Sequence, residues 1–372
     1  MHVHLERLRL TDFRNYASLA VDLGPGHVVL TGENGAGKTN LMEAVSFLSP
    51  GRGLRRATYG EVVRREAPRG FSVFTNLQGM AGPADVGTGA GGPEESGARR
   101  LRINGAPASS AESLLEHLRV LWLTPAMDGL FTGPRSERRR FVDRLTLSID
   151  PAHGKRALDY ERAMRSRNRL LAEGRTDPVW LDGLEAQLAE LGVAIALARR
   201  ELVALLARMI ERGQADGPFP QAGFALAGFA EEDEAAVDLE ERLLADLRTG
   251  RMRDAAAGRT LSGPHRSDLL IRHKAKDMEA ARSSTGEQKA LLIGLVMAHA
   301  RLVAEMTGHP PVLLLDEVAA HLDAGRRAAL FDLIDALGGQ AFMTGTDAAM
   351  FEALGTRAGF FTVANGAVER TA

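Results

Sequence analysis

The sequence predicts an α/β fold, in which a head built around a phosphate-binding loop is interrupted by an inserted, mainly helical second lobe. An apolar strand runs directly into the glycine-rich segment 32–39, and a second apolar strand, 311–315, ends in two acids. Between them, from about Pro134 to Leu247, the pattern becomes helical. We therefore expect three segments: 1–134 with the loop, a helical lobe at 135–250, and 251–372, which completes the head.

Composition limits the classes of function. The chain has 46 basic and 48 acidic residues, a net charge of −2, so any contact with nucleic acid must be local. No apolar run approaches the roughly 20 residues that span a bilayer, which disfavours a membrane protein. The amino terminus has no signal-peptide pattern, and the absence of cysteine excludes disulfides and thiolate metal sites. We expect a cytoplasmic protein.

The first 134 residues read mainly as strands. Alternating or continuous apolar residues predict strands at 5–10, 17–22, 27–32, 71–77, 100–103 and 120–123, with one helix at 40–48. Segment 79–98 is rich in glycine, alanine and proline, and it is expected to be a disordered hairpin loop.

The rest of the chain combines long helices with returning strands. An apolar stripe recurs at steps of three and four in Trp180, Leu184, Leu188, Leu191 and Ile195, which predicts a helix packed against a neighbouring helix. Further strands are expected at 269–272, 312–315, 341–344 and 360–363.

Segment 32–39 fits the P-loop pattern G-x-x-x-x-G-K-[ST] in full. Its glycines let successive backbone N–H groups point into one concavity, and the positive end of the following helix attracts phosphate. Lys38 is expected to reach the β- and γ-phosphates of ATP, and the Thr39 hydroxyl to ligate Mg²⁺. The predicted ATP-binding residues are Gly32, Glu33, Asn34, Gly35, Ala36, Gly37, Lys38 and Thr39.

The two acids after the second strand complete this site. Asp316 is expected to hold Mg²⁺, directly or through water, and Glu317 to act as general base on the attacking water, with Lys38 as the second catalytic residue. The 278 positions that separate Lys38 from Asp316 are too many for a compact kinase or GTPase. They indicate a lobe inserted into the ATPase.

Two further motifs resemble those of ABC-type ATPases. Ser283–Gln288 precedes an apolar helix as the ABC signature does, with Ser284 and Gly286 matching, and Asp323 matches the D-loop. In ABC-type heads the signature of one subunit meets the γ-phosphate bound by the other. One chain carries one of each half, so the pattern predicts a homodimer that encloses two ATP molecules and loosens after hydrolysis.

The wording of the motifs resembles the RecF family. The matching segments are GENGAGKTNLMEA, TPAMDGLFTGPRSERRRFVDRL, SGPHRSDL, STGEQKALLIGL, LLLDEVAAHLD and TGTD, which together span nearly the whole chain. The resemblance implies an ATPase head related to those of SMC proteins. It also implies ATP-stimulated DNA binding, ATP-dependent dimerisation, slow hydrolysis, and work with RecO and RecR in loading RecA at gapped DNA.

The sequence departs from many ABC ATPases at two places. Gly345 or Thr346 stands where a switch histidine is usual, and no Q-loop glutamine follows Leu123, so hydrolysis is expected to be slow. His265, in GPHRSD, either lies near DNA or nucleotide or is held by local hydrogen bonds. His321 either faces a dimer interface or is exposed and inert.

The candidates for DNA contact are arginines. Arg162, Arg165 and Arg169 are spaced to share one helix face, whereas Arg138, Arg139 and Arg140 cannot all do so. The first set is the better candidate for phosphate contact, although a solvated helix face is an equal alternative. No aromatic residues flank these clusters, so the sequence preference for DNA should be weak.

Two other functions remain open from the residues alone. The ATPase subunit of an ABC transporter is disfavoured by the missing switch histidine and Q-loop. An ATP-dependent nuclease with a related head would need an added acidic metal-binding module, and none is evident in the sequence beyond Asp316 and Glu317.

Overall fold

The chain folds into two compact units, each described here by itself. A computed structural model describes residues 2–65, 67, 69–91, 98–174, 178–213, 217–230 and 234–371, without the side chain of His321. Unit 1 comprises Met1–Asp128, Asp216–Pro220 and Ser284–Ala372, and unit 2 comprises Gly129–Ala215 and Gln221–Ser283. The sequence predicts that the helical lobe ends at residue 250. Unit 2 continues to Ser283, because β10 (Asp268–His273) pairs with β9 (Ala222–Ala227).

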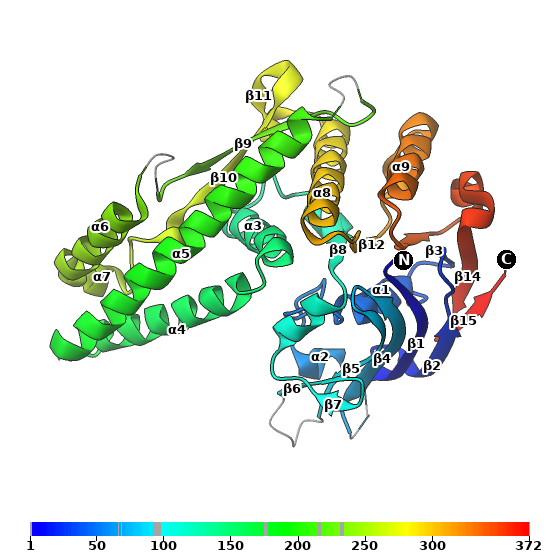
Figure 1. Cartoon of the computed structure of the whole chain (residues 1–372), viewed down its shortest axis with the longest axis horizontal. Helices are drawn as coiled ribbons and strands as arrows, with labels where there is room; N and C mark the ends of the chain where they lie inside the picture. Colours follow the sequence, from blue (N-terminus) through cyan, green and yellow to red (C-terminus); the bar gives the residue numbers. More distant parts are fainter. Residues whose placement is uncertain are drawn as a thin grey trace. The chain divides into compact units, whose positions relative to one another are not determined.

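The first sheet of unit 1 is antiparallel. Its order is β2-β1-β4-β5-β6-β7, visible in blue to cyan in Figure 1. The strands are β1 (His4–Phe13), β2 (Tyr16–Asp22), β4 (Phe71–Gly79), β5 (Gly82–Ala90), β6 (Arg99–Ile103) and β7 (Ala106–Pro107).

Strand β5 corrects one expectation, because it lies inside the segment that the sequence indicates as a disordered loop. Small residues alternate along it: Ala84, Val86, Thr88 and Ala90 are buried, and the residues between them are not. A Cβ on Gly89 would lie 2.3 Å from the carbonyl oxygen of Phe71 on β4, so only glycine fits there. Residues 92–97 of the same segment lie outside the described part of the chain.

The second sheet of unit 1 carries the motifs. Its order is β15-β14-β3-β13-β12-β8, with all pairs parallel except β14 with β15. The strands are β3 (His27–Thr31), β8 (Val120–Leu123), β12 (Val312–Leu315), β13 (Ala341–Gly345), β14 (Ala358–Ala364) and β15 (Ala367–Arg370). Every residue of β3, β8, β12 and β13 is buried, as expected of parallel strands covered on both faces. The strands that the sequence predicts at 27–32, 120–123, 312–315, 341–344 and 360–363 are therefore confirmed, with small differences at their ends.

Helices complete unit 1. They are α1 (Lys38–Ser46), α2 (Tyr59–Val62), α8 (Thr285–Thr307) and α9 (Ala324–Leu337), with 3₁₀ turns at Ala111–Glu116, Pro125–Met127, Ala319–His321 and Ala348–Arg357. One hydrophobic core joins residues of both sheets with α1, including Leu8, Val45 and Leu314. Burial of these side chains away from water is the main term that stabilises the unit.

Helix α8 is long and apolar enough to cross a membrane by length and composition alone. Its most apolar window is 61% buried inside the protein, and it packs beside β8 and α9. That burial is what a core helix of a globular domain shows.

Unit 2 is mainly helical. It contains α3 (Arg135–Ile149), α4 (His153–Ala172), α5 (Pro178–Glu211), α6 (Ala236–Thr249) and α7 (Arg251–Ala257), with 3₁₀ turns at Pro264–Arg266, Lys274–Lys276 and Ala280–Arg282. A three-stranded antiparallel sheet has the order β11 (Met278–Glu279), β10, β9, and the sequence had not indicated β9. The predicted apolar stripe lies on α5, where Leu188 and Ile195 enter a core shared with α4 and α6 (Figure 1), while Trp180 stays largely exposed.

Candidate functional site

The P-loop lies between β3 and α1, with glycines where the backbone demands them. Gly32, at φ 143°, would place a Cβ 2.3 Å from the carbonyl oxygen of Val363 on the neighbouring strand. Gly37, at φ 118°, precedes the first residue of α1, and a Cβ there would lie 2.6 Å from the Asn15 side chain. Gly35 also has positive φ. The loop can therefore turn tightly onto the amino terminus of α1.

This loop borders a pocket of about 160 Å³ in unit 1. Its lining residues are Asn34, Gly35, Gly37, Lys38, Thr39, Asn40, Arg55 and Glu317. Six of the eight come from the loop and the first turn of α1, where free backbone N–H groups and the helix dipole favour an anion. The lining thus brings together the glycine-rich loop and one of the two predicted acids, and it includes no residue of the signature segment.

Lys38 lines this pocket, and two hydrogen bonds hold its side chain. Its side chain is buried, and its Nζ donates to the carbonyl oxygens of Gly32 at 2.6 Å and of Glu33 at 2.8 Å. Burial lowers the pKa of Lys38, while the charges of Glu317 and Asp316 raise it. A phosphate entering the pocket would offer this ammonium stronger, charge-assisted acceptors than the two carbonyls.

The second half of the site follows β12. The Thr39 hydroxyl donates to Asp316 Oδ1 at 3.1 Å, so the P-loop and the acid after β12 are joined directly. Glu317, one residue further on, has φ 53°, a left-handed conformation that is strained for any residue except glycine. Its backbone N–H donates to Thr344 Oγ1 at 2.9 Å.

The donor set at this junction fits Mg²⁺. A threonine hydroxyl and a carboxylate are hard oxygen ligands, and this ion keeps several waters while using one or two protein carboxylates plus substrate phosphates. Because the Thr39 hydroxyl donates its hydrogen bond to Asp316, the lone pairs of its oxygen stay available for a cation. Among the described residues, no cluster of three or more His, Cys, Asp or Glu side chains could hold a metal ion by itself.

The signature residues lie at the start of α8. Ser284 caps this 23-residue helix: its side chain accepts from the Glu287 N–H at 3.4 Å, and the Ser284 N–H donates to the Glu287 carboxylate at 3.1 Å. Ser284, Thr285 and Gly286 are exposed. A Cβ on Gly286 would meet no heavy atom within 4 Å, so packing within the chain does not require glycine there.

Asp323, the predicted D-loop residue, caps α9. Its Oδ1 accepts from the Arg326 N–H at 2.8 Å, and its side chain is 64% exposed. The capping bond gives Asp323 a local structural role besides the one its motif indicates. The side chain of His321, two residues earlier, lies outside the described part of the chain.

The candidate arginines for DNA contact lie on α4. Arg162, Arg165 and Arg169 are all exposed there. Two of them form weak surface pairs, Arg162 with Asp159 at 3.2 Å and Arg169 with Glu173 at 3.9 Å. Their placement on one helix agrees with the predicted spacing.

The competing arginine cluster on α3 is partly structural. Arg138 is largely buried and donates to both carboxylate oxygens of Asp268, at 2.8 and 2.9 Å, and Arg139 donates to the carbonyl oxygen of Ser267. Arg140 is exposed and pairs with Glu137. All three arginines of this cluster therefore have partners within the chain.

His265 is held by hydrogen bonds on both ring nitrogens. Its Nε2 lies 2.9 Å from the Thr260 carbonyl oxygen, which can only accept, so Nε2 carries the proton and Nδ1 accepts from the Tyr160 hydroxyl at 2.9 Å. Burial lowers the pKa of His265. Of the two readings from sequence, the structure supports the locally satisfied histidine.

Sequence reasoning missed several residues at the site. Arg55 and Asn40 line the pocket, and Arg55 donates to the fully buried Glu43, which also pairs with Arg14. Thr344 contacts both acids after β12. The sequence gives one indication for Thr344: it belongs to the TGTD segment, which lies where many ABC ATPases have the switch histidine.

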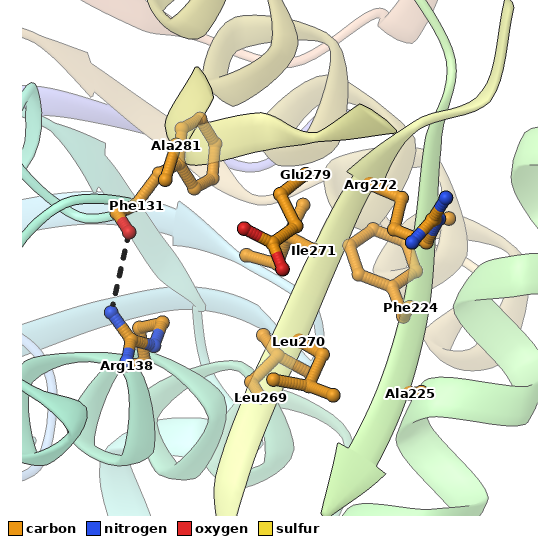
Figure 2. Close-up of a pocket in the computed structure, with 11 residues that line it drawn as sticks. Phe131, Arg138, Phe224, Ala225, Leu269, Leu270, Ile271, Arg272, Glu279 and Ala281 are labelled. Carbon is orange, nitrogen blue, oxygen red and sulfur yellow. Dashed lines mark hydrogen bonds between the residues drawn. The ribbon is translucent and has the colours of Figure 1, made fainter. Parts of the chain in front are cut away.

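A second pocket, of about 410 Å³, lies in unit 2 (Figure 2). Its lining residues are Phe131, Arg138, Gly223, Phe224, Ala225, Leu269, Leu270, Ile271, Arg272, Glu279 and Ala281. The lining is mainly apolar, and its arginines are engaged: Arg138 with Asp268 and the Phe131 carbonyl, Arg272 with Asp277 at 2.9 Å. Its lining includes no glycine-rich loop of the P-loop kind.

The comparisons with known proteins agree with this geometry. Residues 4–369 match the family described as RecF/RecN/SMC N terminal domain. The chain is 67% identical to the DNA replication and repair protein RecF of Rhizobium meliloti (strain 1021), over 98% of both chains, and 66% identical to that of Rhizobium rhizogenes (strain K84 / ATCC BAA-868), over 99% of both.

Solved structures give the fold independently. A structure of the recombination mediator protein RecF with ATP in the RecFOR pathway superposes with a TM-score of 0.86 at 24% identity, covering 100% of this chain and 98% of that one. An Smc head bound to the C-winged helix domain of ScpA superposes with a TM-score of 0.56 at 15% identity, covering 99% and 97%. The fold is therefore that of an SMC-like ABC ATPase head with an inserted lobe.

Proposed function

This chain belongs to the RecF family of DNA replication and repair proteins, and from that membership we propose that it is an ATP-gated DNA-binding protein of recombinational repair and replication restart. The observation that carries the proposal is the hydrogen bond between Thr39 and Asp316, which builds one nucleotide site from two motifs far apart in the chain. The ATP-bound relative noted above supports ATP as the nucleotide.

In the proposed site, the triphosphate lies in the P-loop pocket. Backbone N–H groups of Gly32–Thr39 and the dipole of α1 hold its oxygens, and Lys38 leaves the carbonyls of Gly32 and Glu33 to neutralise the β- and γ-phosphates. Thr39 and Asp316 would hold Mg²⁺, which when bound neutralises charge on the phosphate oxygens. The phosphates are thereby oriented for in-line attack.

Glu317 is the proposed general base. It lines the pocket beside the loop, and its carboxylate would accept a proton from the water that attacks the γ-phosphate. With Gly345 or Thr346 in place of a switch histidine, the chain has one fewer group to position that water, so hydrolysis is expected to be slow. The reaction then serves as a switch that ends a state held by ATP.

The site is completed by a second copy of the chain. Ser284 and Gly286 lie exposed at the amino terminus of α8 and do not line the pocket of their own chain. A helix amino terminus with an exposed serine hydroxyl, bonded only to Glu287 of its own first turn, and no side chain at Gly286 suits close approach to the γ-phosphate of a partner. We therefore propose an ATP-dependent homodimer enclosing two nucleotides, with Asp323 at its interface.

The proposed DNA contacts are Arg162, Arg165 and Arg169 on α4. Arginine matches phosphate geometry, and such contacts bind duplex or single strands with little regard to sequence. RecO and RecR are proposed as partners in loading RecA at gapped DNA, since a relative is described as part of the RecFOR pathway. The work is proposed to take place in the cytoplasm.

One experiment tests the proposal directly. Binding to gapped, duplex and single-stranded DNA is measured with ATP, ADP or neither, together with the mass of the protein under each condition. The proposal predicts that ATP alone produces both the dimer and the tightest DNA binding. Monomers that ignore nucleotide and do not bind DNA would refute it.

The two alternatives are not favoured. The relatives with 67% and 66% identity over nearly the whole chain are DNA replication and repair proteins, not subunits of transporters. A nuclease finds no support either, because the described residues include no added cluster of acids suited to metal ions.

A further inference from the structure

Thr344 lies at the centre of the proposed site although no motif includes it as a functional residue. It is near the carboxyl end of β13, which pairs with β3 on one side and β12 on the other. The P-loop follows β3 and the two acids follow β12, so β13 ends between the two halves of the nucleotide site. Ligands of parallel sheets bind at this carboxyl edge.

The Thr344 hydroxyl makes two hydrogen bonds of opposite sense. It donates to Asp316 Oδ1 at 2.8 Å and accepts from the Glu317 N–H at 2.9 Å. Asp316 Oδ1 also accepts from the Thr39 hydroxyl. One buried hydroxyl therefore fixes the carboxylate proposed to hold the cation and the backbone of the proposed base.

Both contacts depend on the hydroxyl and not merely on the shape of the side chain. Thr344 is 1% exposed, so water has little access to replace a lost bond. Valine has nearly the same shape but neither donor nor acceptor, whereas serine keeps both.

The bond to Glu317 has a further consequence. The left-handed backbone of Glu317, φ 53°, is strained and persists only where surrounding contacts hold it. Thr344 accepts the N–H of that strained residue, so it helps to fix the direction in which the Glu317 side chain leaves the backbone.

We infer that Thr344 is a positioning residue: its hydroxyl holds the Asp316 carboxylate and the Glu317 backbone in fixed positions relative to each other. Cation binding and water activation then both depend on this one hydroxyl. The inference rests on the proposed function of the site. Thr344 does not line the phosphate pocket, so its loss should leave nucleotide affinity without metal unchanged.

The test compares Thr344→Val with Thr344→Ser. Three quantities are measured: the affinity for a fluorescent ATP analogue in EDTA, the affinity of the nucleotide complex for Mn²⁺ by electron paramagnetic resonance, and kcat for ATP hydrolysis. For Thr344→Val we expect Mn²⁺ affinity and kcat each to fall about 10- to 100-fold, the range for outer-shell partners of metal ligands, with affinity in EDTA unchanged. Thr344→Ser should restore both.

Thr344→Ala guards against a folding defect in the valine variant. Alanine also lacks the hydroxyl but adds no new contact, so it should reproduce the loss of Mn²⁺ affinity while thermal unfolding confirms a folded chain. The inference is overturned if Thr344→Val and Thr344→Ala keep wild-type Mn²⁺ affinity and kcat, or if Thr344→Ser is as impaired as they are.

Two outcomes for the wild-type protein separate the proposed function from the role of Thr344. A wild-type protein that binds no nucleotide would refute the proposed function and this inference with it. A wild-type protein that binds and hydrolyses ATP, matched by its hydroxyl-free variants, would refute the inference alone.

Discussion

Thr39 and Asp316, 277 positions apart in the chain, are joined by a 3.1 Å hydrogen bond between hydroxyl and carboxylate. The bond exists because β3 and β12 are both neighbours of β13 in one parallel sheet and end at the same edge. The helical insertion between the two motifs does not separate them.

Replacing Lys38 with methionine should abolish ATP binding. The substitution keeps an unbranched side chain but removes the ammonium, which would make two or more charge-assisted bonds worth about 1.5–3 kcal/mol each. We expect affinity for a fluorescent ATP analogue to fall at least about 100-fold, with no dimer on addition of ATP. Thermal unfolding serves as the control for a folded chain, and undiminished affinity would contradict the assigned role.

Replacing Glu317 with glutamine should separate binding from hydrolysis. The amide has nearly the shape of the carboxylate but cannot accept the proton of the attacking water. We expect kcat to fall about 10²- to 10⁴-fold, with ATP affinity kept and the ATP-bound dimer trapped. Phosphate release and light scattering measure the two effects, and a variant that hydrolyses ATP at the normal rate would rule out Glu317 as the base.

Replacing Arg165 with alanine should weaken DNA binding equally for all sequences. If Arg165 contacts one phosphate, the slope of log K against log salt concentration should fall in magnitude by about 1. Arg140→Ala on α3 is the matched control, because it removes another exposed arginine from the same unit. Equal salt slopes for both variants and the wild type would show that Arg165 is an ordinary solvated residue that does not contact a phosphate.

Acid should destabilise unit 2 through Asp143. Burial alone would raise the pKa of this carboxyl, but hydrogen bonds and charges from His153 and Arg199 outweigh it and lower the pKa from its ordinary value of 3.8 to about 2. Because the folded-state pKa is depressed, the stabilisation is present above pH 4 and is lost as pH falls through 2, an effect of about 2 kcal/mol. Urea unfolding at several pH values measures the free energy of unfolding of the wild type and of Asp143→Asn. The difference between the two should become smaller as pH falls through this range, and a difference that stays constant would contradict the lowered pKa of Asp143.

The sequence was sufficient where a function depends on a local pattern. The P-loop, the strand before it and the acids after β12 are short segments in which residue type, period and order coincide, and all lie where expected. The same holds for Ser284, since a capping serine followed three residues later by Glu287 marks a helix start.

The sequence was insufficient where a role arises from tertiary neighbours. Thr344 gains its contacts only because β13 lies between β3 and β12, an order that no local pattern encodes. Arg138 lies in a basic cluster that the sequence leaves open as a solvated helix face, and its ion pair with Asp268, 130 positions away, exists only in the folded chain. Strand β5 was missed because its buried residues are small, so its hydrophobic alternation is weak.

The measurement that tests the central claim most directly is complementation between two inactive variants, Lys38→Met and Ser284→Arg. The first lacks a working P-loop and the second a working signature, so neither variant should hydrolyse ATP by itself. A mixed dimer has one intact composite site of two, built from the P-loop of the Ser284→Arg chain and the signature of the Lys38→Met chain, so mixing the two variants should restore hydrolysis, to at most about half of the wild-type rate. A mixture that stays as inactive as its components, although mixed dimers form, would contradict a site shared between two copies of the chain.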